Sequence, residues 1–308
     1  MRNIFRGRPK YVTVKAGTAP LKKDVPDGWW VQCQQCKTVL YRKDLERNLG
    51  ICEKCRYHFP MSARERLRML LDDPEAFVET DADLVPGNPL QFPEYEAKKE
   101  RDLKKTGLRD AIITGSGVIE QHPVVLAIME FGFLGGSMGS VVGEKLARAF
   151  DMALDGRLPV VVVSSSGGAR MQEGIISLMQ MQKTAAAVER HSRAGLLYIS
   201  VLANPTTAGV WGSFASQGDV VIAEPGATVG FAGRQVIEAA VGKRVPPDLQ
   251  TAETVFQNGF IDLIVPRDQL KGVIGQLLRL YGCPARKEAA AGAPEPEAKT
   301  DKEPEADK

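Results

Sequence analysis

The chain has 308 residues, of which 44% are hydrophobic and 25% are charged. These proportions are typical of a globular protein with a sizeable core, in one large domain or two. No segment approaches 18 consecutive apolar residues, and the N-terminal MRNIFRGRPK lacks the apolar run of a signal peptide. The sequence therefore indicates neither a membrane span nor secretion, and we expect a cytoplasmic protein.

The net charge of +2 hides a marked asymmetry along the chain. Residues 1–70 contain 16 Lys and Arg against 6 Asp and Glu, whereas the remaining residues contain 24 against 32. We expect residues 1–28 to form a basic N-terminal arm. The basic end is interpreted either as a solvated face or as a surface that binds RNA, DNA or the phosphates of a ligand.

Residues 29–60 contain two pairs of closely spaced cysteines. Cys33 and Cys36 are separated from Cys52 and Cys55 by a gap of 15 residues. This spacing predicts a zinc ribbon, in which four thiolates bind one tetrahedral ion in a closed, structural site. Disulfides are the rival interpretation, but the cytosolic context favours zinc. Four cysteines already complete the zinc shell without His58.

Residues 61–110 are predicted to link the ribbon to the main domain. The segment MSARERLRMLLDD reads as a short amphipathic helix, with Ser62 and Glu65 as a capping box. Three prolines then indicate a loop, and the charged run EYEAKKERDLKK indicates an exposed helix.

A regular alternation of strands and helices begins at Ala111 and defines the domain expected over residues 111–283. This order predicts an α/β domain with a largely parallel sheet. The predicted strands are Ala111–Ile119, Val124–Phe131, Leu158–Val163, Leu196–Leu202, Val220–Ala223 and Ile261–Val265, and the predicted helices are Ser140–Asp155, Arg170–His191, Arg234–Val241 and Gln269–Tyr281. Cys283 is expected to be a free thiol, and residues 284–308 contain no large apolar residue and are predicted to be disordered.

The segment after the strand Leu158–Val163 carries the clearest chemical signal. Three serines and the pair Gly167 and Gly168 precede the next predicted helix. Glycine lets the backbone approach a ligand closely, and amides at a helix start lack acceptors, so the turn suits an oxyanion or a phosphate. A second cluster, Gly132 to Gly139, opens the preceding helix. The alternative is that both clusters are tight turns without a chemical role.

Two other catalytic motifs compete for the glycine turns. Gly135 to Gly139 formally matches G-x-S-x-G, which would make Ser137 the nucleophile of an α/β hydrolase. A triad needs a histidine later in the chain, and His191 is the sole candidate, at the polar end of a long predicted helix. A P-loop also fails, because no G-x4-G-K-[ST] occurs.

Four segments resemble the β subunits of bacterial acetyl-coenzyme A carboxylase carboxyltransferase. They are LYRKDLERNLGICEKC, FGFLGGSMGSVVGEK, SSSGGARMQEGIISLMQMQKT and GFAGRQVIE, and the resemblance extends from about Trp29 to about Tyr281. It implies a spiral domain of the crotonase (ClpP/crotonase) superfamily. It also implies transfer of a carboxyl group from carboxybiotin to acetyl-coenzyme A, giving malonyl-coenzyme A for fatty acid biosynthesis.

The resemblance further implies which residues and partners take part. Backbone amides of Gly167 and Gly168 would hold the thioester enolate, and Arg170 would either meet a coenzyme phosphate or cap the turn. The remaining substrate-binding candidates are glycines of two turns, namely Gly135 and Gly136 in the first and Gly230 and Gly233 in the second. Where the family is expected to have small residues after Pro205, this chain has Trp211 and Gly212.

The chain itself lacks a biotin-attachment motif and a domain large enough to bind ATP and activate bicarbonate. The resemblance therefore implies an α subunit, in an α2β2 assembly, together with a biotin carboxyl carrier protein and an ATP-dependent biotin carboxylase. Two alternatives remain open. One is a zinc-ribbon protein that binds nucleic acid, and the other is a carboxyltransferase for another acyl-coenzyme A, such as propionyl-coenzyme A.

Overall fold

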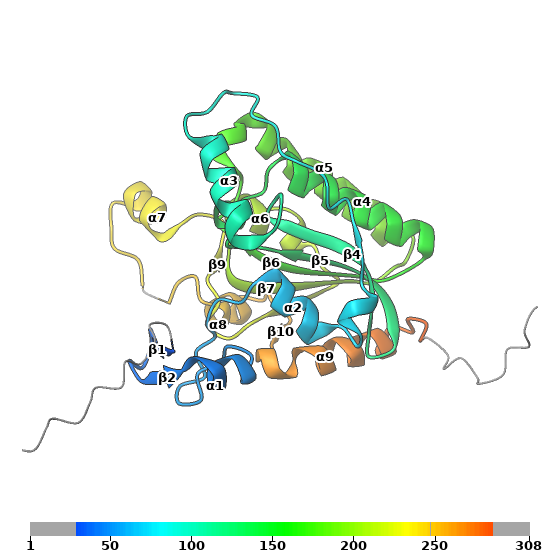
Figure 1. The fold of residues 1–308 in the computed structure, drawn as a ribbon, viewed down its shortest axis with the longest axis horizontal. Helices are drawn as coiled ribbons and strands as arrows, with labels where there is room; N and C mark the ends of the chain where they lie inside the picture. Colours follow the sequence, from blue (N-terminus) through cyan, green and yellow to red (C-terminus); the bar gives the residue numbers. More distant parts are fainter. Residues whose placement is uncertain (1–28, 247, 286–308) are drawn as a thin grey trace, which may run out of the picture.

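The computed structural model describes residues 29–246 and 248–285, so the basic arm and the tail expected from the sequence lie outside the described residues. A small ribbon stands at one end of a larger α/β domain (Figure 1). The ribbon contains two paired antiparallel strands and a short helix, which are β1 (Trp30–Gln32), β2 (Val39–Tyr41) and α1 (Arg42–Arg47).

The α/β domain is built on one mixed sheet. Its strand order is β10-β8-β7-β6-β5-β4-β3, and β9 pairs with β7 beyond this path. The strands β5, β6, β7, β8 and β10 run parallel, whereas β3, β4 and β5 are antiparallel. Their bounds are β3 (Val78–Thr80), β4 (Ile112–Ile119), β5 (His122–Met129), β6 (Val160–Ser166), β7 (Tyr198–Thr207), β8 (Val220–Ala223), β9 (Val229–Gly230) and β10 (Leu263–Ile264).

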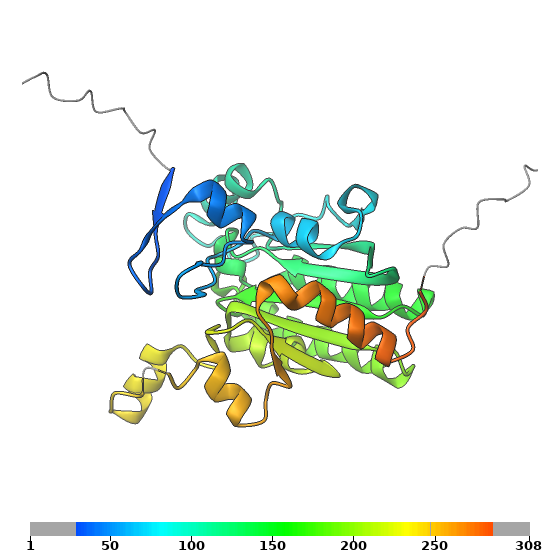
Figure 2. The same ribbon diagram turned by 90° about the horizontal axis from the view of Figure 1, so that it is seen from below.

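Helices cover both faces of this sheet. The long helices α4 (Ser140–Gly156) and α5 (Ile175–Arg193) lie on one face, and α2 (Ala63–Leu70) and α9 (Arg267–Leu280) lie on the other (Figures 1 and 2). The other helices are α3 (Tyr95–Thr106), α6 (Ala208–Trp211), α7 (Arg234–Val241) and α8 (Ala252–Gln257), with short 3-10 turns at Pro74–Ala76, Leu134–Gly136, Met171–Glu173 and Phe214–Ser216. No helix in this described part is long and apolar enough to cross a membrane.

Strand β6 shows why a continuous apolar run becomes a buried parallel strand. Side chains alternate between the two faces of a strand, so Val160 and Val162 enter the core beneath α4 and α5. Val161 and Val163 enter the second core, beneath α2 and α9. Both faces therefore need apolar residues, and the carboxyl end of the strand is left to carry polar ones.

Most predicted elements are confirmed, but one difference affects the site. The helix predicted from Arg170 begins only at Ile175, because Met171–Glu173 form a 3-10 turn and Gly174 has φ +55°. The capping box at Ser62 and Glu65 is present as predicted. The turn with Gly167 and Gly168 is thus separated from the helix start by a further loop.

Candidate functional site

The turns that follow β5 and β6 are bonded to each other at the carboxyl edge of the sheet. The N–H of Gly167 donates to the carbonyl of Gly135 at 2.9 Å, and that of Met138 donates to the carbonyl of Gly168 at 2.8 Å. Gly136 packs so closely that a Cβ there would lie 2.0 Å from the Ser165 carbonyl oxygen. The structure therefore brings the two glycine clusters together, as the edge of a parallel sheet requires.

The turn after β7 completes this edge. Gly168 has φ +117°, and a Cβ there would lie 2.5 Å from the Cβ of Ala208. Ala208 itself has φ +52°, and Thr207, which precedes it, makes no side-chain capping bond to α6. The pairing of Thr207 with Gly230 turns the Ala208 N–H toward the Gly230 carbonyl, whereas the N–H of Gly209, in the first turn of α6, has no hydrogen-bond acceptor among the described residues. The Gly209 amide is a donor that sequence analysis missed.

The expectation that Gly167 and Gly168 present unpaired amides is wrong for this structure. The N–H of Gly168 donates to the hydroxyl of Ser166 at 2.9 Å, and that of Gly167 is taken by Gly135. The physical reason is that α5 begins only at Ile175, so these amides do not lie at a helix start. They donate instead to a side chain of their own turn and to the neighbouring turn. The absence of Cβ atoms still matters, because it lets this turn pack against Ala208.

Arg170 is fully buried, and its hydrogen bonds and ion pairs connect the segments at this edge. Its guanidinium donates to the carbonyl of Ser137 at 2.7 Å, and it forms ion pairs with Asp110 and with Glu173. Burial lowers the pKa of Arg170, but the Asp110 carboxylate raises it more, so the group stays charged. Of the two roles considered for Arg170, the geometry favours holding the turns over contact with a coenzyme phosphate.

The contacts of Ser137 do not form a hydrolase triad. Its hydroxyl accepts a hydrogen bond from Arg170 Nε at 3.1 Å. The His191 ring hydrogen-bonds the carbonyl of Leu158 and packs on Phe150, and no histidine in the described ranges hydrogen-bonds Ser137. A serine that accepts from a buried guanidinium has no general base to activate it.

The remaining predicted glycines lie in different surroundings. Gly135 and Gly233 face open space, whereas a Cβ at Gly230 would lie 2.3 Å from Gln250 Nε2. Strand β9 pairs Gly230 with Thr207, which places it beside the turn after β7. The divergent Trp211 is partly buried and packs against the core, and the Gly212 that follows it leaves room for the Phe231 ring, which lies 2.8 Å from where a Cβ would be.

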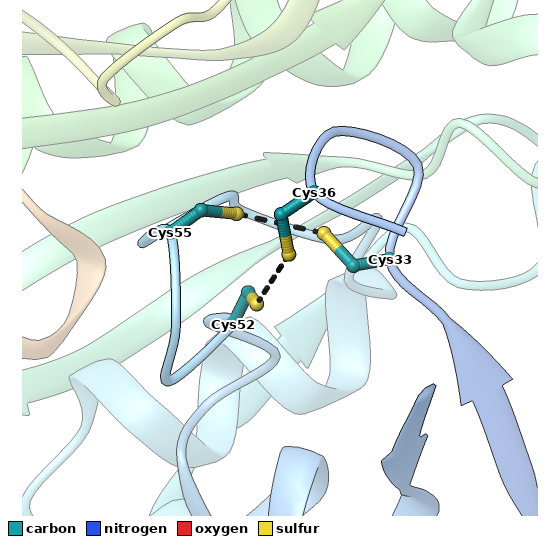
Figure 3. A group of neighbouring side chains, drawn as sticks. All are labelled: Cys33, Cys36, Cys52 and Cys55. Carbon is teal, nitrogen blue, oxygen red and sulfur yellow. Dashed lines mark hydrogen bonds between the residues drawn. The ribbon is translucent and has the colours of Figure 1, made fainter. Parts of the chain in front are cut away.

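The four cysteines of the ribbon form a second site (Figure 3). All four sulfurs lie within 4.8 Å of one another, with Sγ distances of 3.6 Å between Cys33 and Cys55 and 3.8 Å between Cys36 and Cys52. Four thiolates at about 2.3 Å from a tetrahedral zinc ion stand about 3.8 Å apart, so these residues fit zinc closely. His58 is not part of this group, since its Nε2 faces the Arg267 amide at 3.5 Å.

Ionisation of the cluster also points to a cation. Hydrogen bonds from Thr38 lower the pKa of the Cys36 thiol to about 6. Burial raises the pKa of the Cys55 thiol to about 12. Four neighbouring thiols cannot all ionise together without a positive charge between them, which zinc supplies.

A buried charge cluster attaches the ribbon to the domain. Glu224 follows β8 and accepts hydrogen bonds from Arg66 at 2.7 Å and from Arg267 at 2.8 Å. Arg267 also donates to the ribbon carbonyls of Leu49 at 2.9 Å and Phe59 at 3.0 Å. Sequence analysis missed these residues, although a glutamate directly after a buried strand is a usable signal.

Comparison with known proteins identifies the family of the chain. The carboxyl transferase domain family matches residues 61–308, and the acetyl-CoA carboxylase zinc finger domain matches residues 30–55. The acetyl-coenzyme A carboxylase carboxyl transferase subunit beta of Desulforamulus reducens is 49% identical over 284 residues, which are 91% of this chain and 98% of that protein. The chain belongs to this carboxyl transferase family.

Solved structures of the family confirm the fold. Transcarboxylase 12S with hydrolysed methylmalonyl-coenzyme A aligns with a TM-score of 0.61 and 29% identity, over 77% of this chain and 43% of that chain. The Pseudomonas malonate decarboxylase MdcD-MdcE hetero-dimer aligns with a TM-score of 0.57 and 26% identity, over 74% and 90%. The expected crotonase-like domain preceded by a four-cysteine ribbon is thus confirmed.

Proposed function

We propose that this carboxyltransferase chain is the β subunit that moves a carboxyl group from carboxybiotin to acetyl-coenzyme A, yielding malonyl-coenzyme A. The observation that carries the proposal is the 49% identity with an acetyl-coenzyme A carboxylase subunit along almost the whole of both chains. The free amide of Gly209 supports it, because it lies at the edge of the sheet where ligands of such folds bind. Another acyl-coenzyme A, such as propionyl-coenzyme A, differs by one methylene and is the close alternative.

The chemistry we propose for this edge is electrostatic. Removing a proton from the acetyl group places negative charge on the thioester oxygen, and fixed backbone donors stabilise that charge. The amide of Gly209 is a donor free to do so, while Gly167 and Gly168 shape the opposite wall. By resemblance, the biotin product takes the proton, so the chain needs no acidic or histidine base of its own.

A partner chain is part of this proposal. A group of exposed apolar side chains lies beside the glycine turns at the start of α5. Its members are Met171, Ile175, Leu178 and Met179, which are 70%, 68%, 50% and 56% exposed. Clustered exposed apolar side chains of this kind mark protein interfaces. We assign this surface to the α subunit of an α2β2 assembly, which would receive carboxybiotin from a carrier protein charged by biotin carboxylase. A four-cysteine zinc site in place of disulfides supports a reducing, cytoplasmic setting.

A second role, nucleic-acid binding by the ribbon, is supported by one observation. Trp29 and Trp30 are about half exposed, and the Lys43 ammonium lies 6.0 Å from the Trp29 ring. Exposed aromatic rings beside cations suit stacking on single-stranded bases. Charge reversal at Arg42, Lys43 and Arg47 tests this role, since phosphate contacts give affinity a steep salt dependence. A flat salt dependence would remove it.

The proposed function is tested by purifying the chain with its natural partners and identifying them. We expect a carboxyltransferase α subunit at equal stoichiometry, with carrier protein and biotin carboxylase at lower yield. The matched control is the same purification with Leu178→Asp and Met179→Asp, which should release the α subunit while the zinc content stays the same. Recovery of nucleic acid without an α subunit would contradict the proposal.

A further inference from the structure

A cavity of about 140 Å³ lies beside β3, the strand at one edge of the sheet. Four parts of the chain bring charged side chains to its walls. They are α2 with Arg64, β3 with Glu79, the loop between α3 and β4 with Arg109 and Asp110, and α4 with Lys145. Neither the glycine turns nor the ribbon lines this cavity, so it is separate from both sites described above.

Lys145 brings an unsatisfied ammonium group to the cavity. Its side chain is buried, with a relative exposure of 4%, and its Nζ donates to the carbonyl of Ile112 at 3.1 Å. In the part of the chain that the structure describes, the Nζ has no other hydrogen bond and no ion pair, which leaves two of its three N–H groups unused. Burial lowers the pKa of Lys145, because the charge is removed from water. An anion in the cavity would supply the missing acceptors.

Two arginines stand at the same cavity with most of their donors free. Arg64 and Arg109 are both exposed. Arg64 makes no hydrogen bond or ion pair with the described residues, and Arg109 donates to the carbonyl of Asp83 at 3.2 Å. A guanidinium offers five N–H donors in a planar fork that matches the oxygens of phosphate and carboxylate groups. The arginines and the lysine together therefore suit an oxyanion.

The carboxylates at the walls do not cancel this positive charge. Asp110 accepts from Arg170 at 3.0 Å and from the N–H of Ala111 at 2.6 Å, so its charge is already compensated. Glu79 is half-buried and raises the pKa of Lys145, but it forms no ion pair with that group among the described residues. Three cations thus face one uncompensated carboxylate across the cavity.

We propose that this cavity binds a small oxyanion with two negative charges, of the size of inorganic phosphate. Lys145 binds it at the buried wall, and Arg64 and Arg109 bind it from the exposed side. The volume is well below the roughly 300 Å³ at which sites for drug-sized ligands begin, so a nucleotide or a coenzyme is too large. The site goes beyond the proposed function, because no step of carboxyl transfer uses these side chains.

The experiment titrates inorganic phosphate into the zinc-loaded complex with the α subunit, at constant ionic strength, and measures binding by calorimetry. Arg64→Ala should weaken binding about tenfold, the loss expected for one charged hydrogen bond. Arg68→Ala is the matched control, because Arg68 is exposed on the same helix but lines a different cavity. It should leave the affinity for phosphate unchanged. Equal affinities in the unsubstituted complex and in the Arg64→Ala variant would overturn the inference.

The buried cation and the choice of anion are tested in the same assay. Lys145→Met keeps the length of the side chain but removes its charge, and it should abolish phosphate binding at this site. Should that variant fail to fold, Arg109→Ala tests the site independently, since Arg109 is exposed and its loss should again weaken binding about tenfold. Sulfate should bind as phosphate does and chloride should not. Equal binding of chloride, or a preference for bicarbonate, would overturn the assignment to a small dianion.

Discussion

Gly168 and Ala208 are packed so closely that a Cβ at residue 168 would stand 2.5 Å from the Ala208 Cβ. This contact joins the turn after β6 to the turn after β7. It fixes the position of the Gly209 amide, which has no acceptor among the described residues. Because this contact is so close, substitution is expected to have different effects at Gly168 and at its neighbour Gly167.

Gly168→Ala is expected to damage both stability and turnover. The residue has φ +117°, a conformation that costs an L-residue about 1–3 kcal/mol, and the new methyl would also displace Ala208. Gly167→Ala is the matched control, since its nearest neighbour would be the Gly135 oxygen at an ordinary 3.6 Å. Denaturation midpoints and turnover should fall for the first variant and stay near normal for the second. Equal effects would show that Gly168 does not position this edge.

Gly209→Pro removes one free backbone donor. If that amide stabilises the enolate, the turnover rate should fall roughly 100- to 1,000-fold relative to Gly209→Ala, which keeps the N–H. The alanine variant meets mainly the flexible Met181 sulfur at 3.2 Å. Ser137→Ala, which would inactivate a hydrolase, should lower the rate only modestly. Retained thermal stability of both Gly209 variants is the control, and similar rates for the pair would exclude this amide as a donor.

Glu224→Gln tests the buried cluster beneath the ribbon. Burial raises the pKa of Glu224, but Arg66 and Arg267 lower it more, so the folded pKa lies below that of the unfolded chain. The ionised carboxylate therefore stabilises the fold above the unfolded pKa, and this stability is lost as the pH falls toward the folded pKa. At neutral pH the variant should lose about 3–5 kcal/mol of unfolding free energy. The difference should shrink in acid.

Asp268→Asn is the corresponding control for the cluster. Asp268 pairs with Arg56 at 2.8 Å, but both side chains are substantially solvent-exposed, so its loss should cost at most about 1 kcal/mol. Urea denaturation of both variants between about pH 2 and pH 8 makes the comparison, because the stabilisation by Glu224 is lost only below its unfolded pKa. A Glu224→Gln variant as stable as Asp268→Asn throughout would contradict the role of the cluster in fastening the ribbon.

Features that depend on neighbouring residues were predictable from the sequence, because their physical cause is local. The cysteine spacing identified the four sulfurs, and the Ser62 capping box located α2. The apolar run Leu158–Val163 identified a strand buried on both faces. In each case the residues that specify the element also form it.

Features that depend on distant contacts were not predictable. The acceptor of the Gly167 amide is Gly135, and Arg170 pairs with Asp110, 60 residues earlier. No local pattern reports such pairs. The free amide of Gly209 follows a left-handed alanine, Ala208, which the sequence gives no reason to expect.

Measuring the zinc content of the protein tests the four-cysteine site of the ribbon. One ion per chain is expected, and Cys52→Ser should release it and unfold the ribbon, because structural zinc of this type contributes on the order of 10–16 kcal/mol of apparent binding free energy. Cys283→Ser is the matched control, as Cys283 lies outside the four-sulfur group. Elemental analysis decides the matter. A protein without zinc, or one with a Cys33–Cys36 disulfide, would contradict the assignment.

Carboxyl transfer itself is the most direct test of the central claim. The chain, combined with its α subunit and supplied with carboxybiotin and acetyl-coenzyme A, is assayed for malonyl-coenzyme A, with each subunit alone and propionyl-coenzyme A as controls. We predict that malonyl-coenzyme A forms only when both subunits are present, and faster than the propionyl product. No product from the complete, zinc-loaded complex, or a clear preference for propionyl-coenzyme A, would contradict the account.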